Sequence, residues 1–124
     1  MGKKILAIED DPSFSRYISF MLTKEGYEVI MASNGLTGLR KAQEENPDLI
    51  LLDVMLPGLD GFEVCHRLRA EPKTARLPIL MLSAKGQDAD KLAALRVGAT
   101  EFLTKPIERE ALLGKIQEYL SAAT

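Results

Sequence analysis

Short apolar runs alternate with amphipathic segments along the whole chain. Five runs have the length of β-strands, and three of them are almost wholly apolar, which is typical of strands buried on both faces of a parallel sheet. The expected strands are residues 3–8, 27–31, 49–52, 79–82 and 101–103. The segments between them carry apolar residues every three or four positions, which predicts helices with one buried face.

Residues that begin or end helices stand at suitable places between these strands. Pro12 suits a first helical turn, Asn34 and Asp60 can cap the next two helices, and Gly98 can end the fourth. The fourth and fifth helices are expected over residues 87–97 and 108–120. The predicted apolar stripes, in chain order, are Phe14, Ile18, Met21 and Leu22; Leu36, Leu39 and Ala42; Phe62, Cys65 and Leu68; Leu92 and Leu95; and Leu112, Leu113, Ile116, Tyr119 and Leu120.

Strict alternation of five strands and five helices predicts an α/β fold. The expected architecture is a doubly wound, flavodoxin-like five-stranded parallel sheet of order 2-1-3-4-5, with right-handed crossovers and helices on both faces. With 46% hydrophobic and 27% charged residues, the composition is that of a folded protein. We expect residues 1–124 to form a single domain.

Charge and cysteine content exclude several classes of protein. Sixteen basic against eighteen acidic residues give a net charge of −2, without the basic excess that nucleic-acid binding needs. The sequence has no apolar run of about 18 residues that could cross a membrane. A single cysteine, Cys65, cannot form an internal disulfide, which favours a reducing cytoplasm.

Polar residues gather where the predicted strands end. They are Glu9, Asp10 and Asp11 after the first strand, Asp53 after the third, Ser83 after the fourth, and Thr104, Lys105 and Pro106 after the fifth. Sites in open α/β sheets form at these carboxyl ends. With the first and third strands as neighbours, Glu9, Asp10 and Asp53 would share a small pocket, with Ser83 and Lys105 across it.

Such a group of carboxylates calls for a cation. Two carboxylates about 4 Å apart repel each other by roughly 4 kcal/mol at an effective dielectric constant near 20. Mg²⁺ or Mn²⁺, bound by oxygen ligands, would relieve this repulsion and leave positions open for phosphate oxygens. With Lys105 as a second positive charge and the Ser83 hydroxyl as a donor, this is a plausible setting for phosphoryl transfer onto an aspartate.

Four segments together resemble a known family. The segments ILAIEDDPSFSR, PDLILLDVMLPGLDGFEVCHRLR, LPILMLSAKG and GATEFLTKPI occur in order and at suitable spacings. On the evidence of these segments, the chain resembles the receiver domain (CheY-like) of two-component response regulators over essentially its whole length. The resemblance implies a (βα)5 fold that accepts a phosphoryl group from a histidine kinase or phosphotransfer protein and then changes a surface.

The resemblance also implies roles for the acidic residues. Asp53 corresponds to the phosphoacceptor, and Glu9 and Asp10 to the acidic pair that holds Mg²⁺, with Asp10 as the direct ligand. Met55 stands where the family supplies a backbone carbonyl to the metal. Glu9 departs from the commoner aspartate and could act through water, whereas Asp11 is extra and is interpreted as a solvated cap beside Pro12.

Three further residues correspond to parts of the family's switch. Ser83 resembles the hydroxyl residue that closes onto the phosphoryl group, and Lys105 the lysine that contacts it; the family commonly has a cis bond between this lysine and the following Pro106. Phe102 stands at the place of the rotating aromatic, where plain packing and switching remain equal interpretations. Cys65 is expected in the core, and His66, on the same helix, at the surface.

The implied function is a signalling switch in the cytoplasm. Slow hydrolysis of its own acyl phosphate is its only expected turnover, so we do not class it as an enzyme. The surface of the fourth helix, fifth strand and fifth helix would control a downstream protein or an attached output domain, and the chain would be a monomer or a weak homodimer. Candidate contacts there are Lys91, Leu95, Glu101 and Arg109. No contact with membranes or nucleic acid is expected.

Three other functions compete with this interpretation. A phosphatase of the haloacid dehalogenase type would need an acid where Met55 stands, and it would turn over p-nitrophenyl phosphate rapidly. A carrier of flavin mononucleotide would be yellow, and Glu9, Asp10 and Asp11 would repel its phosphate. A receiver acting unphosphorylated as a scaffold remains an alternative. The sequence leaves open whether the chain acts alone or belongs to a longer protein, as well as the cognate kinase and the output.

Overall fold

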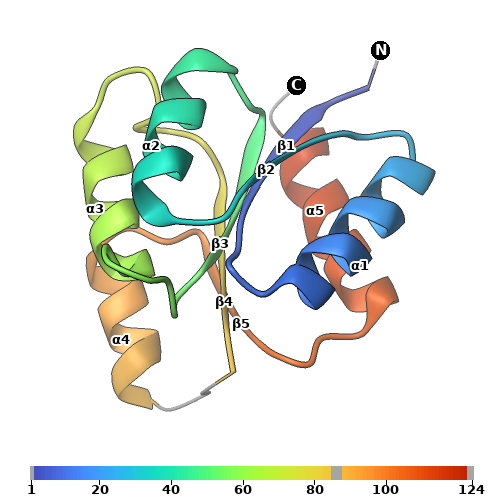
Figure 1. Cartoon of the computed structure of the whole chain (residues 1–124). Coiled ribbons are helices and arrows are strands. Elements are labelled where there is room, and N and C mark those ends of the chain that lie inside the picture. Colours follow the sequence, from blue (N-terminus) through green and yellow to red (C-terminus); the bar gives the residue numbers. More distant parts are fainter. Residues whose placement is uncertain (1, 85–87, 123–124) are drawn as a thin grey trace.

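Five strands alternate with five helices in the described part of the chain (Figure 1). The computed structural model describes residues 2–84 and 88–122. The strands are β1 (Lys4–Ile8), β2 (Glu28–Ala32), β3 (Leu49–Asp53), β4 (Ile79–Ser83) and β5 (Glu101–Thr104). The helices are α1 (Pro12–Lys24), α2 (Gly35–Glu44), α3 (Gly61–Ala70), α4 (Asp88–Arg96) and α5 (Arg109–Ala122).

All four strand pairings are parallel, and the order β2-β1-β3-β4-β5 is the predicted one. The register places Ile8, the last residue of β1, between Ala32 of β2 and Leu52 of β3. Asp53 lies beside Leu82 of β4. The predicted fold class is therefore confirmed, and the winding of the sheet reverses between β1 and β3, where a site is expected.

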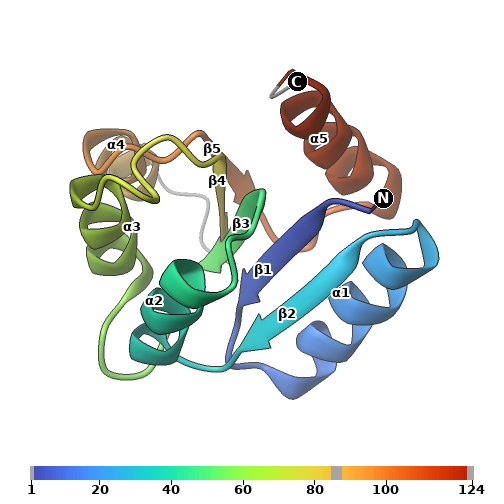
Figure 2. The same ribbon diagram turned by 90° about the horizontal axis from the view of Figure 1, so that it is seen from above.

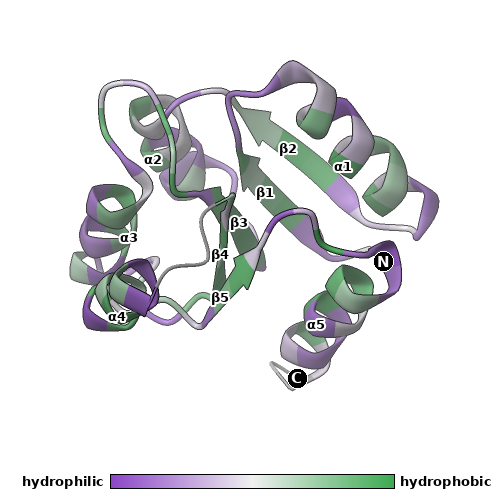
Figure 3. Cartoon of the chain, turned by 90° about the horizontal axis from the view of Figure 1, so that it is seen from below, coloured by the Kyte–Doolittle hydropathy of each residue, from purple (hydrophilic) through white to green (hydrophobic). Residues whose placement is uncertain are grey.

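Helices cover both faces of the sheet (Figures 1 and 2). On one face, α2, α3 and α4 pack over the side chains of Leu6 and Ile8 and their neighbours. On the other face, α1 and α5 pack over Ile5 and Ala7. The two sets alternate along β1 because successive side chains of a strand point to opposite faces. Since both faces are buried, the central strands β3 and β4 are apolar up to their last residue, which is polar (Figure 3).

The predicted caps are present. The side chain of Asn34 accepts a hydrogen bond from the Thr37 amide (2.8 Å), and that of Asp60 accepts one from the Glu63 amide (2.9 Å). Each satisfies a donor of the first helical turn. Gly98 follows α4 with a φ of 93°, a left-handed conformation that suits glycine at a helix end.

The expected buried stripes of α2 and α4 are wrong in part. Leu36, Leu92 and Leu95 are all more than half exposed. Small residues face the sheet instead: a Cβ on Gly38 would lie 2.5 Å from Ile8 Cδ1, and Ala94 is fully buried. The close approach of α2 at Gly38 leaves no room for a leucine at that contact, so Leu36 lies outside it, while Leu39 and Ala42 pack against the core as expected.

The element boundaries differ from prediction by one or two residues. β3, β4 and β5 each include the polar residue that follows the apolar run, because the backbone ladder continues through it. The fourth helix begins at Asp88, and the predicted start at residue 87 lies outside the described residues. Within the described ranges, none of the helices has the length and hydrophobicity needed to cross a bilayer.

Candidate functional site

The ends of β1, β3 and β5 bring three charged side chains together. Backbone hydrogen bonds continue past the strands: the Glu9 amide donates to the Ala32 carbonyl (2.9 Å), and the Lys105 amide donates to the Ser83 carbonyl (2.7 Å). Glu9 and Lys105 are thereby fixed in position although each follows the last residue of its strand. Asp53 ends β3 between them, as expected from the strand order.

Lys105 bridges two carboxylates. Its Nζ donates to Glu9 Oε1 at 2.7 Å and lies 3.3 Å from Asp53 Oδ1. The other oxygen of Glu9, Oε2, accepts a hydrogen bond from the Asp11 amide (3.1 Å). Glu9 and Asp53 are each only 5% exposed, so both charges are largely removed from water. The longer glutamate reaches the lysine directly and is held at both of its oxygens.

Glu9, Asp10 and Asp53 form an acidic cluster. Each offers a carboxylate oxygen, and these three oxygens all lie within 4.8 Å of one another. Asp10 is exposed, whereas its two partners are buried, so the cluster opens to solvent on one side. Several carboxylate oxygens in a cluster that solvent can reach are the donor set that a hard divalent cation such as Mg²⁺ prefers. The residues present therefore fit the predicted metal.

Burial and the neighbouring charges shift the protonation of the site. Burial, and after it the charge of Glu9, raises the pKa of Asp53 from 3.8 to about 6, although Lys105 acts to lower it. For Lys105, burial acts to lower the pKa, but the hydrogen bond to Glu9 and the charges of Asp53 and Glu9 together raise it. One ammonium thus compensates two buried carboxylates only partly, and additional positive charge at this point is favourable.

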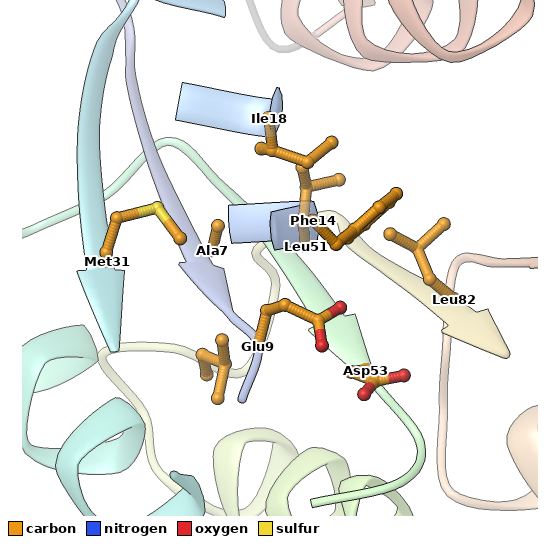
Figure 4. A pocket seen from close by; sticks show the side chains of 9 residues that line it. Ala7, Glu9, Phe14, Ile18, Met31, Leu51, Asp53 and Leu82 are labelled. Atoms are coloured by element: carbon orange, nitrogen blue, oxygen red, sulfur yellow. The ribbon is translucent and has the colours of Figure 1, made fainter. Parts of the chain in front are cut away.

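A small apolar pocket lies behind the charged groups (Figure 4). Its open volume of about 10 Å³ is at the limit of what one water molecule needs. It is lined by Ala7, Ile8, Glu9, Phe14, Ile18, Met31, Leu51, Asp53 and Leu82. The ring of Phe14 also lies near Lys105, with its centroid 4.3 Å from Nζ. The sequence pattern predicted Phe14 only as a core residue. Nothing in the sequence indicates that a residue on the first helix lies against a residue at the end of the fifth strand.

The remaining predicted residues are placed as follows. Ser83 is buried at the end of β4, in register with Thr104. Phe102 is half-buried in β5 and packs against the core under α2, α3 and α4. Met55 lies two residues beyond Asp53, with its side chain exposed. The peptide bond between Lys105 and Pro106 is cis.

Three structural predictions outside the site are confirmed. Asp11 is the N-cap of α1, where its side chain accepts a hydrogen bond from the Ser13 amide (3.2 Å). Cys65 is fully buried, and His66 on the same helix is exposed. Asp11 thus contributes its backbone amide to the site, through Glu9, while its carboxylate serves the helix.

The arrangement suits chemistry at a carboxylate. Asp53 has a pKa near 6, so it is mainly ionised at neutral pH and able to act as a nucleophile. Lys105 and a cation at the acidic cluster would supply positive charge on two sides of any anionic group bound to Asp53. The acidic cluster would repel a phosphate that arrives without such compensation.

Comparisons with known proteins agree with this reading. The family profile of the response regulator receiver domain matches residues 5–117. The chain is 45% identical over 117 residues to the DNA-binding dual master transcriptional regulator RpaA of Synechocystis, covering 94% of this chain and 48% of that protein. It is 36% identical over 118 residues to protein PilH of Pseudomonas aeruginosa, covering 95% of this chain and 98% of PilH. The chain thus spans about half the length of the first relative and nearly all of the second.

A solved structure gives the same result. The receiver domain of the sensor histidine kinase PA1611 from Pseudomonas aeruginosa, which has a magnesium ion coordinated in its active site cleft, superposes with a TM-score of 0.91. Its sequence is 33% identical, and the match covers 98% of this chain and 99% of that one. By family profile, sequence and structure, the chain belongs to the response regulator receiver domains of two-component signalling.

Proposed function

We propose that this chain is a phosphorylation-activated switch whose Asp53 accepts a phosphoryl group from a histidine kinase or a phosphotransfer protein. The observation that carries the proposal is the contact of Lys105 with both Glu9 and Asp53, at 2.7 and 3.3 Å, beside the cluster of Glu9, Asp10 and Asp53. A buried carboxylate flanked by one fixed cation and a place for a second is suited to receive an anionic group.

The metal would be held by Glu9, Asp10, Asp53 and the backbone carbonyl of Met55. A bound Mg²⁺ supplies positive charge that offsets the charge of the phosphoryl oxygens. The magnesium ion in the PA1611 receiver domain supports this choice. Glu9, whose oxygens are held by Lys105 and the Asp11 amide, would hold the metal through a water molecule and also orients the lysine.

In the transfer step, an oxygen of Asp53 attacks the phosphorus of the donor's phosphohistidine. The oxygen–phosphorus bond forms as the phosphorus–nitrogen bond breaks, and the electron pair leaves with the imidazole, which takes up a proton. Lys105 contacts the phosphoryl oxygens and Ser83 donates its hydroxyl to them. Slow attack of water on the phosphorus later restores Asp53, so the only turnover is self-dephosphorylation and the chain is not an enzyme in the usual sense.

The proposed output surface consists of α4, β5 and α5. Leu92 and Leu95 on α4 are exposed, and Glu101 of β5 accepts a hydrogen bond from Tyr119 and pairs with Lys115, both on α5 (3.4 Å for the lysine). Phosphorylation would act on this surface through Ser83 and Phe102, the latter by packing alone. Lys91 is exposed on α4 and stays a candidate contact.

Arg109, the fourth candidate contact, pairs with Glu25 at the end of α1 (3.1 Å). It is exposed and begins α5, so it stays a candidate contact of the proposed output surface. The partners of the switch are a downstream protein or an attached output domain, and self-association, where it occurs, is a weak homodimer through the same surface. We place the protein in the cytoplasm, where phosphorylated donors are made from ATP, without direct nucleic-acid or membrane binding by this domain.

The test uses beryllofluoride, a stable mimic of a phosphoryl group on a carboxylate. We expect tight binding that requires Mg²⁺ and disappears in Asp53→Asn. Chemical-shift changes of the backbone amides in NMR spectra measure this binding. Glu110→Gln is the matched control, since this exposed carboxylate lies on α5 away from the acidic cluster. Undiminished binding in Asp53→Asn, or binding without Mg²⁺, would rule out the assignment.

A further inference from the structure

Lys105 is surrounded by groups from three elements. Two are the carboxylates of Glu9 and Asp53, at 2.7 and 3.3 Å from Nζ. The third is the ring of Phe14, on the first turn of α1, whose centroid lies 4.3 Å from the same nitrogen. An ammonium within about 6 Å of an aromatic face is attracted by the negative charge of that face. The side chain of Lys105 is 18% exposed, so water screens this attraction only in part.

We propose that Phe14 is a positioning residue for Lys105. Its ring holds the ammonium beside Glu9 and Asp53 and keeps it directed at the phosphoryl group on Asp53. The inference rests on the proposed function of Asp53 and adds a residue that the acidic cluster does not include. Phe14 itself touches neither the phosphoryl group nor the metal and acts through Lys105.

The ring of Phe14 can hold the ammonium of Lys105 both before and after phosphorylation, which the carboxylates cannot do. When Asp53 carries a phosphoryl group, Lys105 must leave a carboxylate oxygen and donate to phosphoryl oxygens instead. Glu9 and the phosphoryl group compete for the hydrogen-bond donors of the ammonium, whereas an aromatic face attracts the charge without accepting a strong hydrogen bond. The attraction to Phe14 therefore persists through the exchange and limits how far the lysine can swing toward solvent.

The ring is itself partly buried and packs against the core under α1 and α5. Phe14 lines the pocket together with Ile18, Leu51 and Leu82 (Figure 4). On its own helix it lies beside Tyr17, with ring centroids 6.1 Å apart. A ring locked by packing can position a neighbour, which a freely rotating side chain could not do.

The plain alternative is that Phe14 only fills the pocket. The two roles can be separated because the strength of a cation–π contact depends on the electrons of the ring, while packing depends on its volume. Fluorine atoms withdraw electrons from the ring and change its size little. Phe20 provides a matched control, since it lies on the same helix and has its own lysine neighbour, Lys24, 5.6 Å from the ring centroid.

The first measurement is the affinity for beryllofluoride with Mg²⁺ in proteins that carry phenylalanine with one, two or three fluorine atoms at position 14. We expect the logarithm of the dissociation constant to rise in step with fluorination, and Phe14→Leu to bind about 5- to 30-fold more weakly, the range of a partly desolvated cation–π contact. The same series at position 20 should leave the affinity unchanged. A flat series at position 14, with normal binding by the unmodified protein, overturns the inference but not the proposed function.

The second measurement needs no ligand. The ring current of Phe14 should shift the NMR signals of the Lys105 ε-methylene protons upfield, and Phe14→Leu should return them to ordinary values while the amide spectrum stays that of a folded protein. Unchanged signals overturn the inference. If the unmodified protein binds no beryllofluoride, the proposed function fails, and the positioning role of Phe14 in phosphoryl binding fails with it.

Discussion

Replacing Asp53 by Asn is expected to stabilise the metal-free protein at neutral pH. Burial and Glu9 raise the pKa of Asp53 from 3.8 to about 6, even though Lys105 favours the ionised form. The folded state therefore binds this proton more tightly than the unfolded chain does. The free energy of unfolding falls as the pH rises from about 4 to about 6 and stays low above that range. Asparagine removes the charge but keeps an oxygen that can accept from Lys105.

The magnitude follows from the size of the shift. One pKa unit corresponds to about 1.4 kcal/mol, so the ionisation of Asp53 costs the folded state roughly 3 kcal/mol near neutral pH. We expect Asp53→Asn to be more stable than the wild type by about this amount near pH 7, and the difference to vanish near pH 4.

Urea unfolding, monitored by far-ultraviolet circular dichroism with a chelator present, measures the free energies of unfolding of the wild type and of Asp53→Asn at several pH values. Glu110→Gln, which removes an exposed carboxylate from the first turn of α5, should change the free energy of unfolding by less than about 1 kcal/mol at every pH. Millimolar Mg²⁺ should stabilise the wild type more than Asp53→Asn, since a ligand of the folded state adds to its stability. A variant that is no more stable than the wild type near pH 7, or a difference independent of pH, would refute the electrostatic reasoning.

Two further predictions concern the scaffold. A Cβ at Gly61 would lie 2.3 Å from the Asp53 carbonyl oxygen, so Gly61→Ala should lower the free energy of unfolding by about 1–3 kcal/mol. Gly114→Ala, in open space on α5, should instead raise it by up to about 1 kcal/mol. Equal effects of the two substitutions in urea unfolding would contradict this reading. The Arg69 guanidinium donates to the carbonyls of Gly98, Ala75 and Leu77 and to the Thr100 hydroxyl. Arg69→Met should therefore lower the free energy of unfolding by at least about 2 kcal/mol, far more than the same change at the exposed Arg67. Comparable urea midpoints for the two variants would show that these hydrogen bonds contribute little.

Local patterns predicted the elements well where a single cause determines them. Nearly continuous apolar runs marked β3 and β4, because strands covered on both faces have no polar side. Asn34 and Asp60 marked helix starts, because a cap acts on the amide three residues along the chain. Such effects are local, so the sequence alone contains the information needed to predict them.

Patterns failed where the distance between elements matters. Leu92 and Leu95 continue a helical stripe, yet Ala94 is the residue that α4 buries. Leu36 likewise lies outside the contact of α2 with the sheet, where Gly38 allows close packing on Ile8. How near a helix lies to its sheet depends on every side chain between them, and no periodicity along one helix contains that information.

For the site, the sequence by itself determined which residues carry the charge and at which strand ends they stand. Glu9, Asp53 and Lys105 each follow or end an apolar run, and parallel strands place such ends at one edge. Only the tertiary structure decided the contacts among them: that Lys105 spans two buried carboxylates, that the pKa of Asp53 rises to about 6, and that Phe14 lies against the lysine. Contacts and pKa values depend on distances of a few ångströms and on the exclusion of water, and both arise only when segments far apart in the chain are packed together.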